Sequence, residues 1–260
     1  METNYWALIL GGSSGLGLAT AKKLAKHGYH IIILHRDRRI DMESIESSFN
    51  EIRAHGNQLV ALNVDALNAD KRQDIILEIQ KYLSEGQQIK VMVHSVAKGA
   101  LKPMYSLQES TLTDTDFKIT FDAMALSLFD WTWALVKADL FADDTRIISF
   151  TSEGNTKALP NYSAVSVAKV ALEALTRSIA LEYASIGIKA NCIQAGVTIT
   201  KSLAMIPGYE DIKANALKRN PNNRLTVPED VANVVYLLTT DEAKWITGTV
   251  IKVDGGESLM

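Results

Sequence analysis

An alternation of short apolar runs with longer amphipathic segments constrains this 260-residue chain more than any other feature. Strands are predicted at residues 6–10, 30–34, 59–64, 91–94, 146–151, 188–193 and 249–253. Helices are predicted at residues 16–27, 41–55, 69–83, 162–184 and 229–238, and residues 112–136 are predicted to carry one long helix or two. Strands and helices that alternate in this way form parallel sheets with helices on both faces. The pattern predicts a single α/β domain over residues 1–260, Rossmann-like and doubly wound, with a seven-stranded parallel sheet.

One long stretch, residues 197–227, falls outside the alternation and reads as irregular. It follows a predicted strand end, and α/β sheets bind their ligands beyond the carboxyl ends of their strands. Stretches of this length inside a compact domain are usually functional. We therefore expect residues 197–227 to form a substrate-binding lid.

Composition excludes several classes of partner and location. The net charge of −3 gives no indication of a nucleic-acid surface. No apolar run reaches 18 residues, and the first residues lack the basic and apolar regions of a signal peptide, so no membrane association is expected. Cys192 is the only cysteine, lies in an apolar run and is expected to be buried. A chain that cannot form an internal disulfide fits a reducing, cytoplasmic setting.

A glycine-rich segment joins the first predicted strand to the first predicted helix. Gly11 allows a tight turn, Gly15 allows the backbone to approach a pyrophosphate, and Gly17 allows the helix to pack close to the sheet. Ser13, Ser14 and Leu16 lie between these glycines, where free N–H groups of a helix N-terminus would face the phosphates. A glycine motif alone can be a simple turn, but in this position it predicts dinucleotide binding.

The residues after the second predicted strand indicate which dinucleotide is used. Arg36, Arg38 and Arg39 could hold a 2′-phosphate, which favours NADPH over NADH. The alternative is a solvated charged turn that Asp37 partly neutralises. Asn63 and Val64, at the end of the third predicted strand, are expected to flank the adenine.

Tyr162 and Lys169 are the most informative pair for chemistry. They lie seven residues apart at the start of a predicted helix, which is two turns, so both side chains are expected on one face. A phenol and an ammonium behind a dinucleotide motif favour a hydride-transfer enzyme. In isolation, the same residues could be a packing tyrosine and a surface lysine.

Five sequence blocks, in order and over nearly the whole length, resemble the short-chain dehydrogenase/reductase superfamily and, within it, the enoyl-acyl carrier protein reductases. The blocks are residues 11–17, residues 93–97, residues 117–122, Tyr162 with Lys169, and residues 253–256. The glycine spacing and the chain's ending are more similar to the type III form than to type I.

Two positions depart from ordinary members of that superfamily, and a third keeps their residue. Val165 stands where they carry the catalytic tyrosine, and Met124 stands near their proton-relaying asparagine. Ser152 keeps the position of their catalytic serine. Both losses argue against simple interconversion of alcohol and ketone.

The resemblance implies hydride transfer from NADPH to the β carbon of a trans-2-enoyl thioester. Tyr162 is then the donor to the thioester oxygen, Lys169 binds the nicotinamide ribose, and Ser152 contacts substrate or water. It also implies cofactor contacts from Ser95, Val96, Ala97, Gly196, Thr198 and Thr200. Met205 and Ile206 are expected to line the acyl channel, His94 to be structural, and no metal to be bound.

Two other functions remain open at this point. A reductase of the same fold could act on another enone or on a ketone in a secondary pathway, and a dinucleotide sensor would lack catalysis. The resemblance implies a substrate carried by acyl carrier protein or coenzyme A, with Lys201 and residues 213–219 as a basic docking patch. It also implies a homotetramer built through residues 117–137 and 162–184; Trp131 and Trp133 suit that interface or the core.

Overall fold

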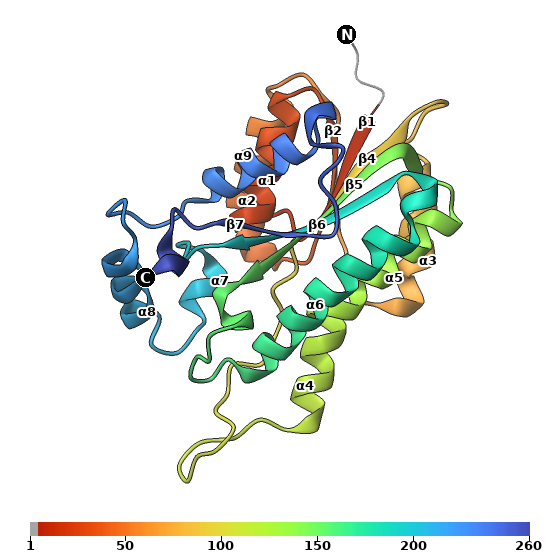
Figure 1. Ribbon diagram of the computed structural model, residues 1–260. Coiled ribbons are helices and arrows are strands. Elements are labelled where there is room, and N and C mark those ends of the chain that lie inside the picture. The colour runs from red at the N-terminus through yellow and green to blue at the C-terminus, as the bar shows by residue number, and fades with distance from the viewer. Residues whose placement is uncertain (1–4) are drawn as a thin grey trace.

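The computed structural model describes residues 5–260 and contains one sheet of seven parallel strands (Figure 1). The spatial order is β3-β2-β1-β4-β5-β6-β7. The strands are β1 (Tyr5–Leu10), β2 (His30–His35), β3 (Leu59–Asn63), β4 (Gln88–His94), β5 (Phe141–Ser152), β6 (Ile188–Ala195) and β7 (Val250–Val253). Each neighbouring pair is parallel, so the predicted Rossmann-like α/β fold is confirmed.

Helices cover both faces of the sheet (Figure 1). The helices are α1 (Gly15–Lys26), α2 (Met42–Arg53), α3 (Ala69–Gln80), α4 (Asp114–Phe121), α5 (Ser127–Lys137), α6 (Ser163–Glu182), α7 (Lys201–Ala204), α8 (Tyr209–Arg219) and α9 (Pro228–Leu238). Helices α1, α2 and α9 pack on one face, and α3, α5 and α6 pack on the other. In β2, Ile31 and Ile33 face the first group whereas Ile32 and Leu34 face the second. A strand buried on both faces needs this continuous apolar run.

The long predicted helix over residues 112–136 is a continuous helix with a π-helical turn, Asp122–Leu126, between α4 and α5. Thr113 and Asp116 cap its start reciprocally. By length and composition, Asp114–Lys137 is the one helix within residues 5–260 that could cross a membrane, and half of its apolar window is buried in the fold. Ala125, Leu128, Trp131 and Leu135 of this helix belong to the hydrophobic core on its face of the sheet, which is the packing expected of a core helix.

The stretch at residues 197–227 is more regular than expected. It contains α7 and α8, so the expectation of an irregular segment is wrong. A parallel bridge between Thr198 and Thr226 joins the two ends of the stretch. We call residues 197–227 the lid, because α7 and α8 border the main cavity.

The strand order reverses between β1 and β4, where the chain leaves β1 toward β2 and later returns beside β1. Such a switch point leaves a crevice at the carboxyl ends of the strands. A cavity of about 560 Å³ lies there, bordered by the loops after β1, β4, β5 and β6.

Candidate active site

Two glycines after β1 allow very close backbone packing. A Cβ on Gly11, whose φ is +86°, would lie 2.3 Å from the carbonyl oxygen of Ser95. A Cβ on Gly17 would lie 2.2 Å from the carbonyl oxygen of Gly11. Only glycine lets α1 start this close to the loops after β1 and β4. The predicted role of Gly17 in close helix packing therefore has a direct steric basis.

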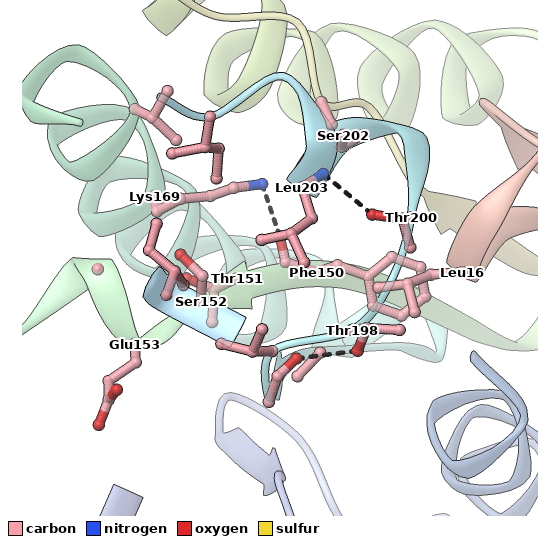
Figure 2. Close-up of a pocket in the computed structure, with 18 of the residues that line it drawn as sticks. Leu16, Phe150, Thr151, Ser152, Glu153, Lys169, Thr198, Thr200, Ser202 and Leu203 are labelled. Atoms are coloured by element: carbon pink, nitrogen blue, oxygen red, sulfur yellow. Dashed lines mark hydrogen bonds between the residues drawn. The ribbon is translucent and has the colours of Figure 1, made fainter. Parts of the chain in front are cut away.

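The N-terminus of α1 is open to an anionic ligand. Ser14 precedes the helix without capping it through its side chain, and the first turn holds no acidic residue. The first N–H groups and the helix dipole therefore remain available to phosphates. Opposite Gly15, the Thr200 hydroxyl oxygen accepts a hydrogen bond from the backbone N–H of Leu203 at 3.2 Å, which leaves its own proton to donate (Figure 2).

The segment after β2 is arranged differently from the expectation. Arg36 pairs with Asp65 at 2.7 Å, and the Asn63 amide accepts from the backbone N–H of Asp37 at 3.1 Å. Asn63 therefore fixes the backbone of this segment. Within residues 5–260, Arg38 and Arg39 are exposed and have no recorded ion pair. The cavity of about 560 Å³ does not reach the arginines, Asn63 or Val64.

Tyr162 lies immediately before α6 and not inside it, which corrects the predicted start of that helix. Its hydroxyl is 3.1 Å from the hydroxyl of Ser152 at the end of β5. A Cβ on Gly154 would lie 2.5 Å from the Tyr162 ring, so the ring occupies space that any larger residue would fill. Burial raises the pKa of Tyr162, and the hydrogen bond with Ser152 offsets this only in part. The phenol therefore stays protonated and can donate.

Lys169 lines the same cavity from α6 and is buried. Its Nζ donates to the carbonyl oxygen of Phe150 at 2.7 Å (Figure 2). Burial lowers the pKa of Lys169 to about 8. Two further donors of the ammonium remain for a ligand.

The position near the expected proton relay is apolar. Met124, Val165 and Ala168 form a small buried cluster, with Leu101 and Tyr162 packed against it. Met124 lies in the π-helical turn, and both Met124 and Val165 border the cavity. A tyrosine or asparagine proton donor is absent from these two positions. The wall can instead contact an apolar part of a substrate.

His94 and Cys192 are buried and take no part in the cavity lining. The His94 Nε2 is 2.7 Å from the Ser127 hydroxyl. Burial, and then the charge of Lys169, lowers the pKa of His94 to about 3, so the ring is neutral near pH 7. Burial raises the pKa of Cys192 to about 11, which keeps it a thiol. Both residues fit the expected structural roles.

The cavity brings most of the predicted site residues together. It is bordered by Gly11, Ser14, Gly15, Leu16, Ser95, Val96, Ala97, Ser152, Tyr162, Lys169, Gly196, Thr198, Thr200, Met205 and Ile206. Ser13 and Gly17 do not border the cavity. No group of His, Cys, Asp or Glu within residues 5–260 is arranged to hold a metal ion.

Sequence reasoning missed several residues of the cavity. They are Gly154, Glu153, Lys157, Arg219 and Glu257. Gly154 follows Ser152 directly, so its glycine could have been noticed as a sign of a close approach. Arg219 and Glu257 lie far in the sequence from each other and from Glu153 and Lys157, and no local motif indicates that these charged residues meet.

The chain is similar over most of its length to known oxidoreductases. The family model described as "Enoyl-(Acyl carrier protein) reductase" matches residues 11–258. The oxidoreductase UcpA of Salmonella typhimurium is 29% identical, covering 99% of this chain and 95% of its own. Two solved structures match over the full chain: an NADH-dependent enoyl-[acyl-carrier-protein] reductase from Aquifex aeolicus (26% identity, TM-score 0.80, 98% of that chain) and an acetoin dehydrogenase from Enterobacter cloacae (24%, 0.80, 97%). The second likeness shows the fold alone.

Proposed function

Because this chain belongs to the short-chain dehydrogenase/reductase superfamily, in the family described as enoyl-(acyl carrier protein) reductase, we propose that it reduces trans-2-enoyl thioesters with NADPH. Membership makes it an oxidoreductase that uses a nicotinamide dinucleotide. The finer assignment, to the carbon–carbon double bond of a fatty-acid synthesis intermediate, rests on the residues of the cavity.

One arrangement carries the proposal. A protonated Tyr162 lies beside Ser152, and apolar residues stand where carbonyl reductases of this superfamily keep their proton donor. The two hydroxyls are 3.1 Å apart, and Val165 and Met124 border the same cavity. A donor aimed at a thioester oxygen stabilises the enolate charge that forms there after addition at the β carbon. The apolar wall suits the acyl chain.

The cavity residues also fit the cofactor. The glycine contacts at Gly11 and Gly17 and the uncapped start of α1 suit a pyrophosphate. When bound, the reduced nicotinamide supplies the hydride. Lys169 would hold the ribose hydroxyls, and its charge strengthens Tyr162 as a donor. The α carbon then takes a proton, which completes the addition of two hydrogens.

The test is cofactor oxidation with crotonyl-CoA, with NADPH and NADH run in parallel. Tyr162→Phe and Lys169→Ala should each lower kcat/KM about 10²- to 10³-fold. Tyr162→Phe should leave NADPH affinity unchanged, because the lost hydroxyl faces the substrate. Equal rates in the variants and the parent protein would contradict the assignment.

NADPH is proposed over NADH because Arg38 and Arg39 are exposed and form no ion pair with any residue from 5 to 260. The Aquifex neighbour named above is described as using NADH, so the cofactor comparison is a necessary arm of the test. A lower KM for NADH than for NADPH would reverse this choice.

A second candidate is reduction of another enone or of a ketone. The close pair formed by Ser152 and Tyr162 favours it, because two hydroxyls can also polarise a simple carbonyl. A panel of crotonyl-CoA, a crotonyl thioester of acyl carrier protein, acetoacetyl-CoA and a simple enone separates the candidates. Cofactor binding without turnover of any member would indicate a sensor.

We further propose an acyl carrier protein as the substrate's carrier. Lys201 and Lys218 are exposed, whereas Lys213 pairs with Glu210 at 3.5 Å and Arg219 is held by Glu153. The positive charge that is available to bind an acidic carrier protein therefore comes mainly from Lys201 and Lys218. Lys218→Glu should raise KM for carrier-bound substrate and leave KM for crotonyl-CoA unchanged.

A homotetramer is the proposed assembly. Seven large apolar residues of the α4–α6 region are exposed: Ile119, Phe121, Phe129, Trp133, Val167, Val170 and Leu181. Trp131, in contrast, is fully buried in the core. Light scattering should give four copies, and Trp133→Glu should reduce that number. The buried thiol of Cys192 supports a reducing, cytoplasmic setting.

A further inference from the structure

One guanidinium connects the lid to two other segments of the chain. Arg219, the last residue of α8, donates to Glu153 through Nη2 at 2.6 Å and through Nη1 at 3.3 Å. Its Nη2 also donates to Glu257 at 2.9 Å. Glu153 follows β5 directly, and Glu257 lies in the turn after β7. A bidentate arginine pair has a fixed geometry that single contacts lack.

Glu257 holds the lid at two points, its first residue and the end of α8. Its second oxygen accepts from the backbone N–H of Val197, the first lid residue, at 3.1 Å. The Glu257 side chain is nearly fully buried, at 3% exposure. A buried carboxylate requires a cation or several hydrogen bonds, and Arg219 supplies the cation. Removing Arg219 therefore leaves a buried charge without its counter-ion.

Two amide contacts continue this attachment beyond α8. Asn220 donates to the carbonyl oxygen of Asp254 at 2.9 Å, and Asn222 donates to that of Gly255 at 2.8 Å. Figure 1 shows α8 beside the last turn of the chain. The lid is thus tied along its C-terminal end to the segment after β7.

Glu153 links the Arg219 contacts to the candidate catalytic residues. Glu153 lies between Ser152, which meets the Tyr162 hydroxyl, and Gly154, which makes room for the Tyr162 ring. Burial works against the charge of Glu153, but hydrogen bonds from Arg219 and Lys157 outweigh it and lower the pKa of Glu153. The pair with Arg219 is therefore ionised at neutral pH.

We propose that Arg219 is a positioning residue whose ion pairs with Glu153 and Glu257 hold the lid over the substrate and keep residues 152–154 in place beneath Tyr162. The kinetic part of this inference rests on the proposed function. The structural part, that Arg219 holds α8 against the rest of the fold, does not depend on any activity.

Hydrogen exchange of the lid tests the structural part. In Arg219→Gln, the amides of residues 205–218 should exchange about tenfold faster, because charged hydrogen bonds to two carboxylates are lost. Glu257→Gln is a second variant. It removes the ion pair between Arg219 and Glu257 without leaving a buried carboxylate unpaired. It should accelerate the same amides, and its amide oxygen can still accept from Val197.

Arg224→Gln is the matched control. Arg224, a lid residue beyond α8, forms a bidentate pair with Asp230 of α9, at 2.6 and 3.0 Å, and neither residue borders the cavity of about 560 Å³. Its loss should leave exchange in residues 205–218 unchanged. If Arg219→Gln behaved like Arg224→Gln in this measurement, the proposal would be overturned.

Steady-state kinetics test the second part. Arg219→Gln should raise KM for crotonyl-CoA about tenfold and lower kcat less, while the Kd for NADPH stays constant. Arg219→Lys should recover part of the KM, since an ammonium retains the charge but not the bidentate geometry. If no variant or parent protein turns over a thioester, the proposed function fails, and the exchange measurement still decides the role of Arg219. Unchanged KM in an active Arg219→Gln enzyme would contradict the kinetic part.

Discussion

The two sides of the cavity, the proposed phosphate side and the proposed substrate side, are built from different parts of the chain. On the phosphate side, backbone meets backbone, and added Cβ atoms on Gly11 and Gly17 would lie 2.3 and 2.2 Å from carbonyl oxygens. On the substrate side, the contacts are made by side chains such as Tyr162 and Arg219. The phosphate side therefore has a fixed shape, whereas the substrate side depends on interactions that can be broken and remade. A binding site for a constant ligand and a site for entering substrates have these opposite requirements.

Among the changes that compare the two sides, the largest effect is expected on the phosphate side. Gly17→Ala places a methyl group against a backbone carbonyl that cannot move aside, and overpacking of this kind costs about 1–3 kcal/mol. The Kd for NADPH should rise roughly 100-fold, since 1.4 kcal/mol corresponds to a factor of ten. Isothermal calorimetry measures the Kd, and a thermal melt checks that the variant folds. Unchanged affinity would show that the backbone contact does not shape the phosphate site.

Gly154→Ala is the reciprocal change on the substrate side. The added methyl group would lie 2.5 Å from the Tyr162 ring and must displace it. A catalytic group displaced by about 1 Å costs up to about 100-fold in rate, so kcat should fall roughly 30-fold. The Kd for NADPH should stay at the parent value, and a parallel rise in Kd would mean that the two sides are not independent.

The pH profile separates catalysis from folding. Burial lowers the pKa of Lys169 to about 8, so kcat/KM should fall about tenfold per unit as the pH rises above about 8 and the ammonium is lost. Because the folded pKa lies below the ordinary 10.5, the unfolded chain holds this proton more tightly, and the contribution of Lys169 to stability increases between about 8 and 10.5. A loss of activity over this interval therefore cannot come from Lys169 destabilising the fold. Lys169→Arg should remove the decline, and a profile that still falls at pH 8 in this variant would assign it to another group.

The smallest effect is expected at the cofactor's ribose. Arg38→Gln combined with Arg39→Gln should raise KM for NADPH about fivefold, because exposed charge pairs contribute up to about 1 kcal/mol. Arg36 already pairs with Asp65, so Arg36→Gln should change KM less. KM for NADH is the control. An equal rise in KM for both cofactors would contradict a contact between these arginines and the 2′-phosphate.

The same contrast explains what could be predicted from the sequence. The strands were predicted because each is a continuous apolar run, and the glycine loop because its residues are neighbours in the chain. The Arg219 contacts were missed because their partners lie 66 and 38 positions away. A charged residue in a stretch that reads as irregular is usually solvated. Only the folded structure shows that the carboxylates of Glu153 and Glu257 contact Arg219.

Smaller errors have similar causes. The apolar periodicity begins at Tyr162 and therefore predicts that this residue lies inside the helix, whereas α6 begins at Ser163 in the structure. Helix ends are set by local capping and packing that periodicity does not reveal. The sequence does not reveal the role of Gly154, because this glycine makes room for the ring of Tyr162, which lies eight residues further along the chain.

The complete burial of Cys192 makes this protein suited to site-directed fluorescence. It is the sole cysteine in the sequence, its exposed fraction is 0%, and its thiol does not ionise near neutral pH. A maleimide dye would therefore attach only to a cysteine introduced by design. Placed at the exposed Ala214 on α8, such a dye would test whether the lid moves when ligands bind, with no background label to subtract.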